Sequence, residues 1–170
     1  MIEFFLNNKK VKAKDDETIW TVAKREGIVL PHLCFADKPG YRADGNCRAC
    51  MVSIEGERGL AASCIRKPTE GMKVVTNDER SSKSRKMVLE LLVTDQPNRE
   101  TSHDPDSHFW QMADKVNVKK SRFDKRNPET IPEADNSHVA MSVNLDACIN
   151  CNLCVRACRE VQVNDVIGMG

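Results

Sequence analysis

The 170-residue chain can hold one ordinary domain or two small ones, and it contains eight cysteines but only 5% aromatic residues. Its net charge of +1 argues against a dominant nucleic-acid or anionic-membrane partner, and no stretch approaches the roughly eighteen apolar residues that a membrane span needs. A core so poor in aromatics is modest, and small domains of this kind commonly need a covalent or metal staple.

The cysteine content also bears on the compartment. The first eight residues carry no basic leader, and their apolar run is too short for a signal peptide. We therefore expect a cytoplasmic protein, in which thiols stay reduced and clustered cysteines usually serve metal or redox chemistry. Two basic runs, Lys83–Lys86 and Lys119–Arg126, are expected to be solvated faces or a docking surface rather than a nucleic-acid site.

Residues 1–78 predict a compact α+β unit. Apolar residues alternate on either side of Asn7 and Asn8, which indicates a hairpin with one solvated face. Thr18 or Asp16 can cap a short helix that Gly27 ends. An irregular loop and two further strands are expected at 31–50, 51–54 and 73–76. This order of hairpin, helix, long loop and returning strands predicts a β-grasp ferredoxin-like domain.

Residues 79–115 predict a helical segment. Apolar residues recur at helical spacing over 79–95. A second helix is expected to begin at Asp104 and Pro105, with Asp104 as the N-cap, because proline is tolerated in a first turn. Its buried side is expected to comprise Phe109, Trp110 and Ala113.

Residues 116–140 are polar and lack periodicity. A structureless connection of this length is unusual inside a compact domain, so we expect an extended linker that lies over another surface. Residues 141–170 then hold the second cysteine group.

The first cysteine group has the spacing C-x12-C-x2-C-x13-C and comprises Cys34, Cys47, Cys50 and Cys64. A [2Fe–2S] cluster takes four thiolates, two for each iron, with backbone N–H groups directed at its sulfurs. Glycine suits such close approach of the backbone, and Gly40 and Gly45 lie just before Cys47. A structural zinc site usually pairs two short cysteine knuckles, whereas this group has one, and disulfides fit the compartment badly.

This spacing differs from the plant-type pattern. From Pro31 to Cys64, with Gly45-Asn46-Cys47-Arg48-Ala49-Cys50 at its centre, the sequence resembles the N-terminal [2Fe–2S] domain of the large electron-transfer subunit of respiratory complex I, iron-only hydrogenases and NAD-linked formate dehydrogenases. The resemblance implies that all four cysteines bind the cluster.

The second group has the spacing C-x2-C-x2-C-x3-C and comprises Cys148, Cys151, Cys154 and Cys158. In two-cluster bacterial ferredoxins the first three cysteines of such a run bind one [4Fe–4S] cluster and the fourth binds the other. Arg159 replaces the usual proline, and a second run does not follow before Gly170. We therefore expect the chain to be a fragment of a longer polypeptide, or a neighbour to complete the clusters.

A third motif of this family is missing. Complex I and hydrogenase relatives carry a His and three Cys between the two groups, and alignment on His103 places Ser107, Trp110 and Val116 at the cysteine positions. None of these side chains replaces a thiolate on iron. The third cluster is expected to be absent, with His103 and His108 as capping or surface residues. His32, two residues before Cys34, is expected to be a partly exposed loop residue.

The segments 93–97, 103–107 and 144–168 resemble the α (catalytic) subunit of NAD-dependent molybdenum- or tungsten-containing formate dehydrogenases. The resemblance covers only the electron-relay part of that subunit, and it implies a partner β subunit with flavin (FMN) and NAD sites and a Mo or W bis-pterin site beyond residue 170. No catalytic residue is expected in this chain, so whether it is an enzyme by itself is left open.

Two other functions stay open. The chain resembles, less closely, the small diaphorase-type electron-transfer subunit of an NAD-linked hydrogenase or a complex I relative. A zinc-stapled interaction module without a redox role is the alternative of another class.

Overall fold

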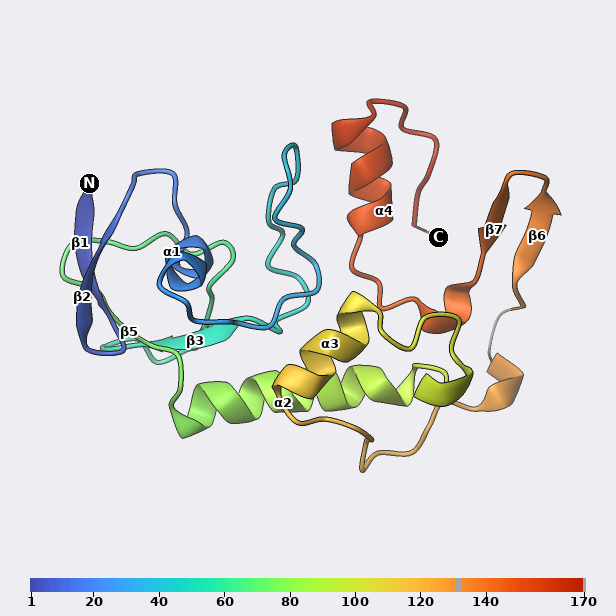
Figure 1. Ribbon diagram of the computed structural model, residues 1–170, viewed down its shortest axis with the longest axis horizontal. Coiled ribbons are helices and arrows are strands. Elements are labelled where there is room, and N and C mark those ends of the chain that lie inside the picture. The colour runs from blue at the N-terminus through green and yellow to red at the C-terminus, as the bar shows by residue number, and fades with distance from the viewer. Residues whose placement is uncertain (131–132, 170) are drawn as a thin grey trace.

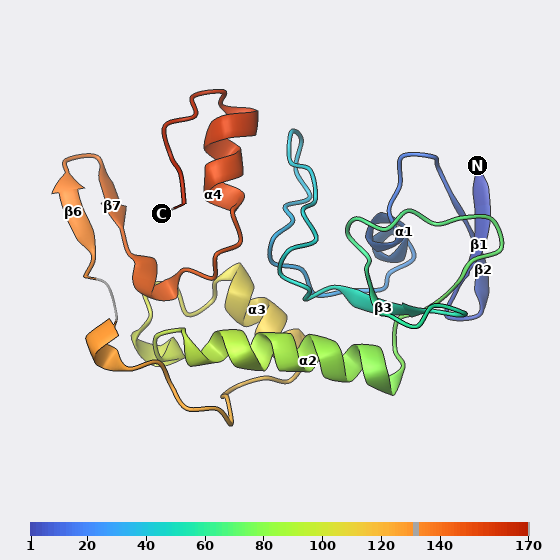
Figure 2. The same cartoon turned by 180° about the vertical axis from the view of Figure 1, so that it is seen from behind.

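The computed structural model describes residues 1–130 and 133–169 (Figure 1). A β-sheet domain lies at one end, a C-terminal arm with a small hairpin lies at the other, and the long helix α2 runs beneath both (Figures 1 and 2). No helix in the described part of the chain is long and apolar enough to cross a membrane.

The first hairpin pairs β1 (Ile2–Leu6) with β2 (Lys9–Ala13) in antiparallel register. Asn7 and Asn8 form its turn with φ of 49° and 67°, in the left-handed region that asparagine tolerates. Helix α1 (Ile19–Arg25) follows, and the side chain of Thr18 accepts a hydrogen bond from the backbone N–H of Thr21. The predicted hairpin and the predicted helix cap are confirmed.

The main sheet has the order β2-β1-β5-β3-β4, formed with β3 (Met51–Ile54), β4 (Ala61–Ala62) and β5 (Lys73–Val75). β5 runs parallel to β1, and the other neighbours are antiparallel. Helix α1 packs on this sheet, because Trp20 and Val22 share one core with Phe4 and Val74. The structure confirms an α+β ferredoxin-like domain, and β4 is a short strand that the sequence pattern did not predict.

A second core joins α2 (Glu79–Thr94) to α3 (His108–Lys115). Asp78 caps α2 by accepting a hydrogen bond from the N–H of Ser81. The predicted start of the second helix at Asp104 is wrong, since α3 begins after Ser107. The Asp104 carboxylate instead accepts the N–H of Asp106, which closes a local turn before the helix. The predicted buried residues Phe109, Trp110 and Ala113 are confirmed.

The C-terminal arm contains a two-stranded sheet and a short helix. β6 (Asp135–His138) pairs with β7 (Met141–Val143), so a strand lies within the segment for which the sequence predicts an extended linker. α4 (Leu153–Arg156) continues into a single π-helical turn at Ala157–Val161. Short 3-10 turns occupy Arg99–Thr101, Pro128–Thr130 and Leu145–Ala147.

Candidate metal centre

The structure brings the four cysteines of the first group together. Cys34 lies in the loop after α1, Cys47 and Cys50 precede β3, and Cys64 follows β4. The thiol of Cys34 interacts with those of Cys47 and Cys64, and the thiol of Cys50 interacts with that of Cys64. Cys34, Cys50 and Cys64 are at most 1% exposed, and Cys47 is half-buried. Three separate chain segments thus converge on one site.

Backbone N–H groups are directed at these sulfurs. The N–H of Cys47 lies 3.4 Å from the Sγ of Cys34, and the N–H of Asn46 also donates to that sulfur. The N–H of Ala49 donates to Cys47, and the N–H of Cys64 donates to Cys50. Sulfur in the thiolate form accepts hydrogen bonds better than a neutral thiol does, so the loop is built to hold negative charge on sulfur.

The four thiols shift one another's pKa in opposite directions. Hydrogen bonds from Cys47 and then Cys64 lower the pKa of Cys34, and a hydrogen bond from Cys64 lowers that of Cys50. The pKa of Cys47 is raised by Cys34 and by burial, and that of Cys64 is raised by Cys34 and then Cys50. Full ionisation of all four therefore needs positive charge at the site, which iron would supply.

These contacts link the four thiols in a row, from Cys47 to Cys34, from Cys34 to Cys64 and from Cys64 to Cys50. Among residues 1–130 and 133–169, no three His, Cys, Asp or Glu side chains surround a single point as the ligands of one metal ion would. A [2Fe–2S] cluster takes its four thiolates two by two. The four thiols match the number of ligands that such a cluster needs.

Glycine is required in this loop at Gly45, although for a reason the sequence did not give. Its φ is 64°, and a Cβ atom there would lie 2.6 Å from the Cδ1 of Ile65, the residue after Cys64. The backbone conformation thus selects glycine, and the Ile65 side chain would have to shift for any other residue.

The second cysteine group is more open. Cys148 and Cys154 are exposed, Cys151 is half-buried and Cys158 is buried. Burial, and then the neighbouring Cys154 and Cys148, raise the pKa of Cys151. Cys158 instead accepts the N–H of Val166, 3.3 Å from its Sγ. Cys148 likewise accepts the N–H of Asn150, 3.5 Å from its Sγ. The second group is therefore less enclosed than the first.

Arg156 joins the two cysteine regions, and the sequence pattern did not single it out. Its guanidinium donates to the carbonyl oxygens of Cys34 and Arg42, the latter at 2.6 Å, and lies 3.5 Å from the Asp44 carboxylate. The side chain is 4% exposed. Arg42 also forms an ion pair of 2.9 Å with Glu160. An arginine buried within the cysteine motif therefore fixes α4 against the first loop.

Part of the missing third motif lines a cavity of about 260 Å³. His103, Ser107 and Trp110 line it together with Cys151. The Trp110 ring is buried, and the Arg99 guanidinium lies 5.5 Å from its centroid. An indole thus occupies part of the region where the resemblance would place a third cluster.

Two histidines link α3 to the first cysteine loop. The Nε2–H of His108 donates to the carbonyl oxygen of His32 at 2.7 Å, and the two rings lie 4.7 Å apart. Burial, and then the charge of His108, lower the pKa of His32. His108 is exposed, as predicted, and it also makes a specific contact two residues before Cys34.

Residues 1–79 match the family model described as a 2Fe-2S iron-sulfur cluster binding domain. This part of the chain therefore has both the sequence pattern and the fold of a [2Fe–2S] domain.

Three similar proteins extend the comparison to nearly the whole chain. The NADP-reducing hydrogenase subunit HndD of Solidesulfovibrio fructosivorans is 28% identical over 98% of this chain and 29% of its own length. The mitochondrial NADH-ubiquinone oxidoreductase 78 kDa subunit of Candida albicans is 28% identical over 98% of the chain and 22% of its own. A crystal structure of NAD⁺-reducing [NiFe]-hydrogenase superposes with a TM-score of 0.82 at 28% identity, covering 99% of this chain and 71% of that one. The chain thus spans less than a third of these two curated relatives.

Proposed function

We propose that this chain is an iron–sulfur electron relay. In this proposal Cys34, Cys47, Cys50 and Cys64 bind one [2Fe–2S] cluster. Cys148, Cys151 and Cys154 contribute to a [4Fe–4S] cluster, and Cys158 contributes to a second one. The supporting observation is the convergence of four thiols from three chain segments, with backbone N–H groups directed at their sulfurs.

The placement of the first loop suits electron transfer. Cys50 and Cys64 belong to the core under the sheet, whereas Leu33 and Ala49 belong to the core formed with α2 and α3. A loop fixed on two sides changes little in geometry when its cluster gains or loses one electron. Its hydrogen bonds and burial would set the reduction potential of the cluster.

The test is the metal content of anaerobically purified protein. Iron and acid-labile sulfide in equal amounts, with visible absorption that dithionite bleaches and a reduced-state EPR signal, would support the relay. A colourless, iron-free protein containing zinc would refute it and favour the interaction module. The Cys50→Ser variant should lose the [2Fe–2S] spectrum, whereas Cys154→Ser, in the exposed second group, should keep it.

The more specific proposal is the electron-relay region of an NAD-dependent formate dehydrogenase α subunit, in the cytoplasm. In it, electrons from formate oxidation at a Mo or W bis-pterin site pass through these clusters to a partner subunit that carries FMN and reduces NAD⁺. The resemblance of segments 103–107 and 144–168 supports it. So does the cavity in which Ser107 and Trp110 stand where hydrogenase and complex I relatives have cysteines.

A second candidate is the small diaphorase-type subunit of an NAD-linked hydrogenase or a complex I relative. The superposition on NAD⁺-reducing hydrogenase over 99% of the chain favours it. The complex purified through a tag on this chain distinguishes the two. NAD⁺ reduction with formate, together with Mo or W, supports the first, and reduction with hydrogen, together with nickel, supports the second.

A further inference from the structure

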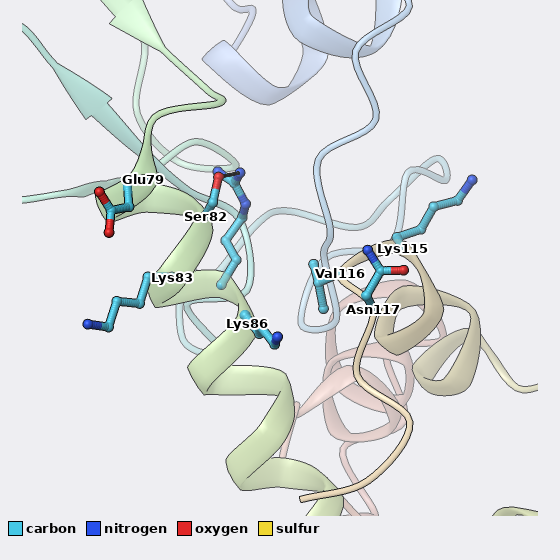
Figure 3. A pocket seen from close by; sticks show the side chains of 8 residues that line it. Glu79, Ser82, Lys83, Lys86, Lys115, Val116 and Asn117 are labelled. Atoms are coloured by element: carbon cyan, nitrogen blue, oxygen red, sulfur yellow. Dashed lines mark hydrogen bonds between the residues drawn. The ribbon is translucent and has the colours of Figure 1, made fainter.

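Two basic segments that are far apart in the sequence meet in one groove. One cavity of 610 Å³ is lined by Lys83 and Lys86 of α2 and by Lys115, at the end of α3. A second, of 380 Å³, continues it past Lys119 and Lys120. Both are lined by Lys86 and Asn117, so they form one continuous groove, called the lysine groove below. Figure 3 shows Lys86 pointing toward Val116 and Asn117, with Lys83 and Lys115 at its outer edges.

The lysines of the groove outnumber the acidic side chains that line it. All five lysines are exposed, and none forms an ion pair with another residue in 1–130 or 133–169. Of the two acidic residues that line the groove, Glu90 is already paired with Arg122 at 3.4 Å, which leaves Glu79. A local excess of positive charge thus lies on a protein whose net charge is only +1.

One wall of the groove contacts the strand that follows the first cysteine group. Arg85, also in the lining, is buried and donates to the carbonyl oxygen of Met51, the residue after Cys50, and to that of Thr76, both at 2.7 Å. The buried arginine holds α2 against β3, so the lysines keep a fixed position relative to the sheet. A partner in the groove would therefore lie beside the domain that carries Cys50.

We propose that the lysine groove is a docking site for an acidic segment of a partner protein. Grooves that bind single-stranded nucleic acid combine basic residues with aromatic side chains on which bases stack, and neither cavity is lined by an aromatic side chain. An anionic membrane is a flat surface and would not fill the groove between α2 and the segment after α3. An extended acidic polypeptide complements both the shape and the charge, and such pairing mainly provides specificity and association rate.

The test is the binding of a fluorescently labelled poly-glutamate peptide to the whole chain at low and moderate salt. The triple variant Lys83→Gln, Lys86→Gln and Lys115→Gln should weaken binding about tenfold and flatten its salt dependence. The matched control, Lys14→Gln, Lys38→Gln and Lys67→Gln, removes the same charge from exposed lysines that line neither cavity, and it should bind as the parent does.

Two outcomes overturn the proposal. Equal weakening in the control variant would show that only net charge matters. Tighter binding of poly-uridylate or of phosphatidylserine vesicles, lost in the same triple variant, would assign the groove to nucleic acid or membrane. Iron content is measured on the same samples, so the absence of a cluster is distinguished from failure to dock.

Discussion

Replacement of Arg156 by methionine should release the C-terminal helix from the first cysteine loop. Methionine fills a similar apolar volume but cannot donate to the carbonyl oxygens of Cys34 and Arg42. Hydrogen bonds from a charged donor contribute roughly 1.5–3 kcal/mol each, so the loss of two should weaken docking of α4 by at least about 3 kcal/mol. That free energy corresponds to a shift of roughly 150-fold in the docking equilibrium.

Amide hydrogen exchange measures this equilibrium directly, because protection reflects the free energy of local opening. We expect exchange over residues 153–161 to be about 100-fold faster in Arg156→Met than in the parent chain, with little change in β1 or α1. Arg156→Lys retains one donor group and should fall between them. Arg159→Met is the matched control, because Arg159 is exposed and its ion pair among the described residues is with Asp165.

The reasoning is refuted if Arg156→Met and Arg159→Met exchange equally over these residues. It is also refuted if exchange rises evenly through the whole chain, because that pattern would mean a global loss of stability. Retention of the [2Fe–2S] spectrum in the variant would show that the first loop stays folded while α4 is free.

Three further predictions concern single residues of the first domain and its boundary. Gly45→Ala should lower the free energy of unfolding by about 1–2 kcal/mol because of its φ of 64°, and further because of the contact with Ile65. Thermal unfolding should show a larger loss than in Gly56→Ala, where φ is 83° and no atom lies within 4 Å. An equal loss in the two variants would contradict the contact. Asp78→Ala should lower the free energy of unfolding by about 1 kcal/mol. Burial opposes ionisation of Asp78, but hydrogen bonds from Ser81 lower its pKa overall. Its contribution is therefore present above the unfolded pKa of about 3.9 and is lost as the pH falls through the lower folded value. Parent and variant should converge in stability once the pH lies below that folded value, and a constant difference would argue against the ionised cap. Cys64→Ser should abolish the first cluster but leave the helix content and the iron bound by the second group unchanged. Iron analysis of the full complex, together with circular dichroism, would measure both.

Much of the first domain could be predicted because its determinants are local. Asn7 and Asn8 fit a turn with positive φ, Thr18 caps the helix that follows it, and alternating apolar residues fix the strand faces. The cysteine spacing likewise identified all four residues that the structure brings together. Strand β4, only two residues long, has too little sequence for alternation to mark it.

The remaining features depend on contacts between distant residues. The hydrogen bond from Arg156 to Cys34 joins residues 122 positions apart, and nothing in the sequence around Arg156 distinguishes a buried arginine from an exposed one. The lysine groove likewise forms only when the end of α3 is placed beside α2. The predicted start of α3 is wrong because Asp104 can form either an N-cap or a turn, and local sequence favours both.

A ribosome must release residues 73–75 before β5 can pair beside β1, whose residues emerge first. All four thiols of the first group lie between those two strands in the chain. During synthesis all four therefore lie in an unfolded, oxidisable segment of the nascent chain until β5 pairs with β1. If iron and sulfide were delivered in that interval, cluster binding would help the loop and the sheet to fold around it.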